Sequence, residues 1–291
     1  MSETWTIGRL IHWAGGHLAQ YQASAPRLSG ELLLARVLGC SRVDLYLRFE
    51  QPLTPEELAA YKALILRRRA GEPLAYILGR REFYGLDLAV GPGVLVPRPE
   101  TEHLVEEALK HLQGLPAPRL LDLCTGSGAV ALACLAGCAD PTAVGVDISP
   151  RALDFARANA RSLGLEGRIA WLQGDLWDAV APAGGFFEVI TANPPYVRLD
   201  EWPRLSREVR AFEPELALVG GEDGLDLTRQ IIAGAGAFLR PQGWLLIELG
   251  AGQAPAAREL AAAAGIFAEV CTVKDLAGIE RVLCCQRGDW G

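Results

Sequence analysis

The sequence predicts an α/β fold, in which a largely parallel sheet covered by helices follows a small helical bundle and a β-hairpin linker. From residue 119 onward, short apolar runs alternate with helical stretches, as in strand–helix–strand units with right-handed crossovers. Before residue 70, apolar residues recur only at helical spacing. The 291 residues are half apolar, which is enough for two cores. We expect the bundle at residues 1–80, the linker at 81–98 and the α/β domain at 99–291.

The N-terminal region has the pattern of a helical bundle. The apolar residues at helical spacing include Leu32, Leu33, Val37, Leu58, Leu64, Ile65 and Leu66. Thr54 is placed to cap a helix that begins at Pro55. Glu56 and Glu57 then put carboxylates at the positive end of the helix dipole. Ser29 precedes another of the helical runs.

The linker has the pattern of a hairpin. The stretch from Phe83 to Val90 alternates and is followed by Gly91-Pro92-Gly93, which is typical of strands and turns. A new helix should begin near Pro99, because Glu100 and Glu102 fall in its first turn.

The α/β region contains seven candidate strands and four candidate helices after the one near residue 99. The expected strands are 120–123, 143–147, 169–172, 187–191, 244–249, 270–273 and 282–285. The expected helices are 129–136, 150–163, 225–238 and 255–264. Ligands of such sheets bind at the carboxyl ends of the strands, so the site is expected there.

Composition restricts the possible partners and location. The net charge of −7 and the pI near 5.3 supply no general attraction to a polyanion, so we expect no stable nucleic-acid binding. The sequence shows neither a long uncharged apolar run nor the basic and apolar opening of a signal peptide. We therefore expect a soluble, cytoplasmic protein without membrane partners. Seven scattered cysteines without a C-x-x-C pair are expected to be reduced, and no metal site is predicted.

A glycine-containing loop follows the first strand of the sheet. The segment Cys124-Thr125-Gly126-Ser127-Gly128 leaves this strand and enters a helix, with glycines where the backbone must turn and approach a ligand. We interpret it as a nucleotide-type cofactor loop. With Ala131 it also spells G-x-G-x-x-A, so a dinucleotide site remains open, as does a plain structural turn.

Two carboxylates follow the next two strands. Asp147 lies about 20 residues beyond the glycines, where a carboxylate can accept hydrogen bonds from a ribose diol. Its structural alternative is to cap the following helix, which Ser149 can do equally well. Asp175 could accept from an adenine amino group while Leu176 or Trp177 covers the ring, or it could be an ordinary turn residue.

The motif Asn193-Pro194-Pro195-Tyr196 ends the fourth strand and indicates the chemistry. Two prolines fix two φ angles and remove two donors. The Asn193 side-chain oxygen and the Pro194 carbonyl can then both accept from one planar NH2 group, and Tyr196 offers a flat face to it. Such positioning can lower the barrier to methyl transfer onto that nitrogen. We therefore predict an S-adenosylmethionine-dependent methyltransferase that acts on a planar amide or amine nitrogen.

These motifs together resemble the protein-(glutamine-N5) methyltransferases of the PrmC/HemK type. The matching segments are Phe83 to Leu86, Val94 to Glu102, Leu121 to Gly128, Asn193 to Tyr196, Phe212 to Pro214, Ala217-Leu218, Gly220 to Leu225, Glu248 to Gly250 with Gln253, and Lys274 to Leu276. The similarity covers nearly the whole chain, and the stretch from Pro97 to Glu102 is its sharpest marker.

The resemblance implies a Rossmann-like, seven-stranded class I methyltransferase domain after a helical bundle that docks class I peptide chain release factors. It implies that residues 124–128 and Asp147 hold S-adenosyl-L-methionine, which is converted to S-adenosyl-L-homocysteine. It further implies that Asn193 touches cofactor and substrate, that residues 194–196 line the pocket for the glutamine of a Gly-Gly-Gln loop, and that the stretch from Pro97 to Glu102 abuts the site. Cys124 departs from the glycine common in the family, and Leu176 from an aromatic residue found in some members.

Three other functions remain possible on this sequence. An N6-adenine or N4-cytosine methyltransferase acting on DNA or RNA presents the same planar NH2 group, but it would need base flipping and a basic groove. Arg67 to Arg69 and Arg80-Arg81 form a local basic cluster, which we interpret as a solvated face or a contact for an acidic partner. A nicotinamide-dependent oxidoreductase would leave the two prolines unexplained, and a non-catalytic module would not need Asn193.

Overall fold

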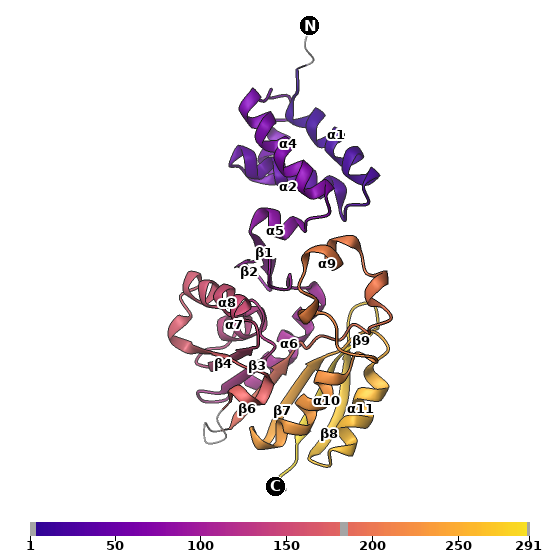
Figure 1. Ribbon diagram of the computed structural model, residues 1–291. Coiled ribbons are helices and arrows are strands. Elements are labelled where there is room, and N and C mark those ends of the chain that lie inside the picture. The colour runs from indigo at the N-terminus through magenta and orange to yellow at the C-terminus, as the bar shows by residue number, and fades with distance from the viewer. Residues whose placement is uncertain (1–3, 181–185, 290–291) are drawn as a thin grey trace. The chain divides into compact units, whose positions relative to one another are not determined.

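The computed structural model (Figure 1) describes residues 4–180 and 186–289, so the opening Met1-Ser2-Glu3 lies outside the described part. The chain divides into two compact units. The first consists of Met1–Arg80 with Ser206–Phe212, and the second of Arg81–Leu205 with Glu213–Gly291. Within the described residues, none of the helices has both the length and the apolar character that crossing a bilayer requires.

The first unit is helical, as the apolar spacing predicts. Its helices are α1 (Ile7–Gln20), α2 (Pro26–Leu38), α3 (Arg42–Leu47), α4 (Pro55–Arg69), α5 (Leu74–Leu78) and α9 (Arg207–Phe212). Thr54 and Glu57 form the reciprocal capping box that starts α4. The helix near Ser29 starts earlier than its sequence suggests, at Pro26, so Ser29 is a buried residue inside α2.

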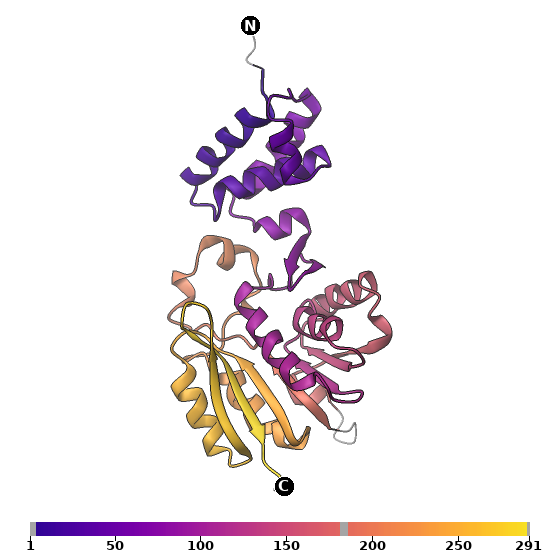
Figure 2. The ribbon, with the colours of Figure 1, turned by 180° about the vertical axis from the view of Figure 1, so that it is seen from behind.

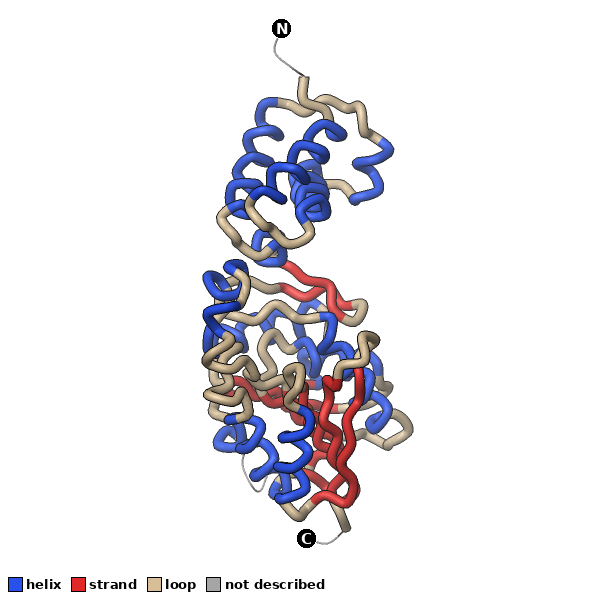
Figure 3. Tube along the Cα trace, turned by 90° about the vertical axis from the view of Figure 1, so that its right-hand side faces the viewer, coloured by secondary structure: helices blue, strands red, loops and turns tan. Residues whose placement is uncertain are grey.

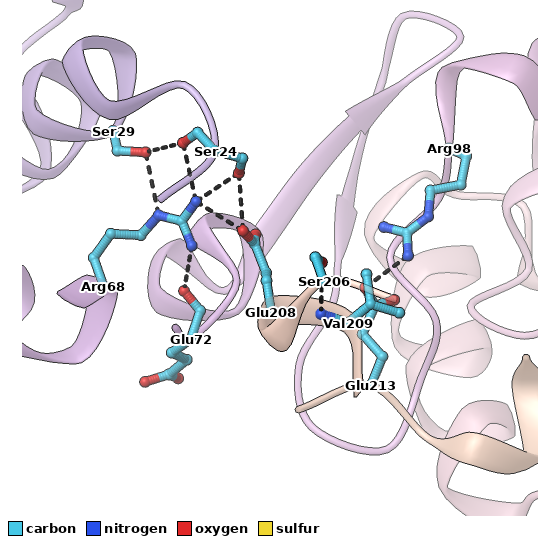
Figure 4. Close-up of polar contacts among 9 residues, drawn as sticks. All are labelled: Ser24, Ser29, Arg68, Glu72, Arg98, Ser206, Glu208, Val209 and Glu213. Carbon is cyan, nitrogen blue, oxygen red and sulfur yellow. Dashed lines mark hydrogen bonds and ion pairs between the residues drawn. The ribbon is translucent and has the colours of Figure 1, made fainter. Parts of the chain in front are cut away.

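The expectation that Arg67 to Arg69 form a solvated or partner-binding face is wrong for Arg68. Its side chain is 1 % exposed and donates to the Ser24 carbonyl, the Glu72 carbonyl and the Glu208 carboxylate (Figure 4). A buried guanidinium needs acceptors around it, and residues of three separate segments supply them. Glu208 belongs to α9, so this ion pair explains why residues 206–212 group with the helical unit.

The predicted hairpin is present, with strands β1 (Arg80–Phe83) and β2 (Leu86–Ala89). Its turn is Tyr84-Gly85, where both residues have positive φ, as a tight two-residue hairpin turn requires. The segment Gly91-Pro92-Gly93 therefore follows the hairpin. A 3₁₀ turn, η1 (Pro99–Thr101), then leads into α6 (Glu102–Leu112), close to the predicted helix start.

All seven predicted strands form one sheet. They are β3 (Arg119–Leu123), β4 (Thr142–Asp147), β5 (Ile169–Gln173), β6 (Phe187–Ala192), β7 (Leu239–Glu248), β8 (Phe267–Lys274) and β9 (Glu280–Arg287). Their order is β5-β4-β3-β6-β7-β9-β8, and only β9 runs antiparallel to its neighbours. The predicted largely parallel sheet is thus confirmed.

Four predicted helices of this unit are also present, as α7 (Ala129–Gly137), α8 (Pro150–Ser162), α10 (Asp226–Gly234) and α11 (Ala254–Ala263). The third is shorter than expected. After α10 the chain tightens into a 3₁₀ turn at Ala235–Ala237, and β7 begins at Leu239, five residues before the predicted strand. A register shift between β6 and β7 marks this irregular start, which alternation alone does not reveal.

Helices cover both faces of the sheet (Figure 3). The apolar residues of α6 and α7 pack on one face, and those of α10 and α11 on the other. Seen from behind, α6 lies on the side of the sheet nearest the viewer (Figure 2). The chain moves outward from β3 to β5 and then returns to place β6 beside β3. The carboxyl ends of β3 and β6 therefore flank the topological switch point, where ligands of such sheets bind.

Candidate active site

A cavity of about 300 Å³ lies within the second unit at this switch point. Its lining comes from the carboxyl ends of β3, β4 and β6, the turn after β5, the segment from Gly93 to Thr101, and residues 214–219. Each expected carboxylate and the start of the Asn-Pro-Pro-Tyr motif reach it. The sheet topology thus brings together residues about 100 positions apart in the sequence.

The glycine loop contributes Cys124, Thr125, Gly126 and Ser127 to the lining. Gly128 lies outside it. Gly128 has a φ of +80°, and a Cβ there would approach the Trp171 ring to 2.7 Å, so both backbone conformation and packing demand glycine. Cys124 has a φ of +55°, in the left-handed region that an L side chain adopts at a cost. Glycine would adopt this conformation without that cost.

Asp147 organises the loop from the end of β4. Its carboxylate accepts from the Gly126 N–H at 2.8 Å and from the Ser149 N–H at 2.9 Å. Burial raises the pKa of Asp147, while these two backbone donors lower it. Ser149 caps α8 by accepting from the Ala152 N–H, so the helix does not need Asp147 as its cap. Asp147 lines the cavity, and its remaining lone pairs can accept further hydrogen bonds.

The structure decides which side chain faces the cavity after β5. Asp175 and Leu176 line it, and Leu176 is 5 % exposed with a φ of +44°. Trp177 instead donates its indole N–H to the Gln230 carbonyl and stacks on Phe238. Of these two neighbours, Leu176 is therefore the one that presents an apolar side chain to the cavity.

The Asn193 side chain lies at the cavity with a defined orientation. Its Nδ2 donates to Thr101 Oγ1 at 3.1 Å, which leaves Oδ1 as the end that can accept from a ligand. Pro195 also lines the cavity, whereas Pro194 and Tyr196 do not. The Tyr196 carbonyl accepts from Gln253 Nε2 at 2.9 Å, and burial raises the pKa of the Tyr196 phenol. Tyr196 is half-buried and packs next to this cavity without lining it.

The segment from Pro97 to Glu102 does abut the site, because Pro97, Arg98 and Thr101 line the cavity. Glu213 holds this segment in place. Its carboxylate accepts from the Val96 N–H at 3.0 Å. It also accepts from Arg98 at 2.6 Å (Figure 4). Glu213 is 5 % exposed and the Arg98 side chain 30 %, so this charge-assisted pair is partly shielded from water.

Sequence reasoning missed Asp122, which is the most buried carboxylate of the cavity. Asp122 is 1 % exposed and accepts from Thr125 at 2.5 Å and from Thr191 at 2.8 Å. Burial raises its pKa to about 6, although these hydroxyls and a backbone N–H lower it. A charged residue inside the apolar run of β3 was the available signal, because such a residue must be paired or functional when buried.

Comparisons with known proteins agree with this geometry. A family model described as "PrmC N-terminal domain" matches residues 9–79, and one described as "Methyltransferase domain" matches residues 120–212. Proteins named release factor glutamine methyltransferase from Rhodopirellula baltica and Geobacter sulfurreducens are 40 % and 42 % identical to this chain. The first match covers 97 % of both chains, and the second covers 97 % of this chain and 96 % of the relative. This chain belongs to the release factor glutamine methyltransferase family.

The fold agrees with that membership. A methyltransferase structure from Pyrococcus furiosus superposes with a TM-score of 0.52 at 19 % identity, covering 78 % of this chain and 98 % of that one. The glycine loop lies within residues 120–212, which match the methyltransferase domain model. The dinucleotide interpretation of the same loop is therefore set aside. The chain is a methyltransferase, and its family implies S-adenosylmethionine dependence.

Proposed function

We propose that this protein transfers a methyl group from S-adenosyl-L-methionine to the side-chain N5 of the glutamine in the Gly-Gly-Gln loop of class I peptide chain release factors. The observation that carries the proposal is the orientation of Asn193, whose Nδ2 is engaged by Thr101 so that Oδ1 can accept from a planar NH2 group. Membership of the release factor glutamine methyltransferase family supports the choice of a glutamine amide over a base.

The residues of the cavity fit the cofactor by their chemistry. We propose that residues 124–128 form its loop, that Asp147 accepts from the ribose hydroxyls, and that Asp175 accepts from the adenine amino group. Leu176 covers the adenine ring. When bound, S-adenosylmethionine supplies an electrophilic methyl group on its sulfonium, and S-adenosylhomocysteine is the product. The carboxylates bind hydroxyl and amino groups, while the apolar lining excludes water from the transfer.

The motif at the end of β6 is proposed to bind the glutamine. The Asn193 Oδ1 and the Pro194 carbonyl accept the two hydrogens of the amide NH2, while Pro195 and Tyr196 shape the surrounding pocket. Hydrogen bonds to these hydrogens strengthen as positive charge develops on the nitrogen, so they stabilise the transition state more than the ground state. Asn193 is neutral, so the proton lost after methyl transfer passes to water.

We propose that the N-terminal bundle at residues 1–80 docks the release factor. The hairpin at 81–98 is then a linker, and residues 99–291 form the catalytic domain. A protein that modifies translation factors is expected in the cytoplasm. The net charge of −7 is unfavourable for stable nucleic-acid binding.

One competition experiment tests the substrate. The protein is incubated with labelled S-adenosylmethionine, a class I release factor and duplex DNA together, and the methyl group is located by mass spectrometry. Label on the Gly-Gly-Gln glutamine is the expected result. Label on adenine N6 or cytosine N4 would overturn the proposal in favour of a base methyltransferase.

A variant tests the role of Asn193. N193A should lower kcat by roughly 10²- to 10³-fold, as does loss of one oriented transition-state hydrogen bond in other enzymes. Cofactor affinity, measured by calorimetry, should change little. The wild type in this comparison also tests whether the protein is a non-catalytic module, because such a module would show no turnover.

A further inference from the structure

The orientation of the Asn193 amide decides whether the proposed glutamine site can work. The amide presents an accepting oxygen at one end and a donating nitrogen at the other. Thr101 Oγ1 lies 3.1 Å from Asn193 Nδ2, and Thr101 is 4 % exposed. A hydroxyl can either donate or accept, so Thr101 by itself is compatible with both orientations. Another group must remove this ambiguity.

Glu248 is placed to do so, because it ends β7 beside the end of β6. The two strands are parallel, and Ala192 pairs with Ile247. Asn193 and Glu248 are the residues that follow this pair, so they leave the same edge of the sheet together. Glu248 is 2 % exposed, and its Oε2 has no hydrogen-bond partner among residues 4–180 and 186–289. A buried carboxyl oxygen without a partner is costly and calls for an explanation.

The surroundings of Glu248 connect it to both sides of the glutamine site. Burial raises the pKa of Glu248 to about 7. The hydroxyls of Thr101 and Tyr196 and the charge of Arg281 on β9 lower this pKa and so offset part of the effect of burial. Glu100, in the same 3₁₀ turn as Thr101, raises that pKa further. The two hydroxyls therefore favour the ionised form of Glu248.

We propose that Glu248 is a positioning residue that sets the orientation of Asn193 through Thr101. When Glu248 is ionised, it accepts the Thr101 hydroxyl hydrogen, so Thr101 Oγ1 can only accept from Asn193 Nδ2. Oδ1 then faces the substrate nitrogen. This inference rests on the proposed function and adds to it the source of the orientation. When Glu248 is protonated, it can donate to Thr101, which is then free to donate to Asn193 Oδ1 and withdraw that oxygen from the substrate.

The first test compares threonine variants in the full-length protein. T101V should lower kcat for the release factor by up to roughly 100-fold through misorientation of one group, with an unchanged Kd for S-adenosylmethionine. T101S keeps the hydroxyl and should restore most of the activity. T228V is the matched control, because Thr228 is also buried and its hydroxyl has no partner in the described residues. Turnover of T101V equal to that of T228V would overturn the proposal.

The second test uses pH. Glutamine methylation by the wild type should fall as the pH drops through about 7, because Glu248 then becomes protonated. E248Q has no group to titrate at this position, so its pH profile should lose this decline. A decline that persists unchanged in E248Q would overturn the assignment, because a purely structural role of Glu248 leaves the profile in place.

A third measurement separates this inference from the proposed function. In protein labelled with ¹⁵N-asparagine and free of substrate, the side-chain NH2 signals of Asn193 should titrate near pH 7 in the wild type and not in E248Q. If they do, while no release factor is methylated, the substrate proposal fails and the positioning role stands. If release factor is methylated while these signals are insensitive to pH and to E248Q, only the positioning role fails.

Discussion

Replacing Arg68 with methionine should destabilise the helical unit by about 3 kcal/mol. Methionine keeps the aliphatic stem and removes every donor that Arg68 directs at Glu72, Ser24 and Glu208. Breaking a buried pair by removing one partner costs about 3–5 kcal/mol. We expect the lower end, because the Glu208 side chain is 23 % exposed and keeps a hydrogen bond from Ser24. The Ser24 carbonyl likewise keeps one from Ser29, which leaves the Glu72 carbonyl as the principal loss.

Hydrogen exchange followed by mass spectrometry measures this loss where it occurs. A change of about 3 kcal/mol accelerates exchange of the protected amides of α2 and α4 roughly 100-fold. R67M is the matched control, since Arg67 is 46 % exposed and its pair with Glu72 is worth at most about 1 kcal/mol. Exchange in R68M no faster than in R67M would refute the reasoning. A uniform acceleration over the whole second unit would show that the effect is global rather than local.

Three further predictions concern the cavity. D147A should weaken S-adenosylmethionine binding at least tenfold in calorimetry, because the ribose would lose a charged acceptor. The N–H groups of Gly126 and Ser149 would lose the same acceptor. An unchanged Kd would show that Asp147 does not bind the cofactor. Burial raises the pKa of Asp122 to about 6, so the folded protein binds more protons than the unfolded chain between about pH 4 and 6. The free energy of unfolding should therefore fall as the pH rises through that window, by at most about 1.4 kcal/mol per pH unit. D122N should lack this slope in urea unfolding, and parallel pH profiles for the two proteins would contradict the assignment. At Cys124, with its φ of +55°, C124V should be less stable than C124G by about 1–2 kcal/mol, and equal urea midpoints would argue against backbone strain there.

Local patterns were sufficient for most elements of the fold. The Thr54 cap was visible in the sequence because capping involves residues three positions apart. The seven strands were recognised because each is a short apolar run between turn signals. Boundaries were less accurate where regular structure degrades, as between Gly234 and Leu239, because a 3₁₀ turn and an irregular strand start have no distinct periodicity.

For the candidate site too, local sequence patterns determined one part and the tertiary structure decided the rest. Sequence alone determined which residues follow the strands of the sheet, including Asp147 and Asn193, because parallel strands necessarily present their carboxyl ends at one edge. Only the tertiary structure decided that Leu176 rather than Trp177 faces the cavity. The two side chains are neighbours at a tight turn, and the sequence does not show in which direction each of them points.

The longest-range relations were beyond any local pattern. Asn193 donates to Thr101 across 92 positions, and Arg68 pairs with Glu208 across 140. Such contacts depend on where separate elements meet in space, and the periodicity of a single element reports only which of its faces is apolar. A buried polar group appears in the sequence simply as a charged or hydroxyl residue, whose partner emerges when the chain has folded around it. The sequence by itself therefore determined the architecture and the chemical character of the site, and the tertiary structure decided how its side chains are held.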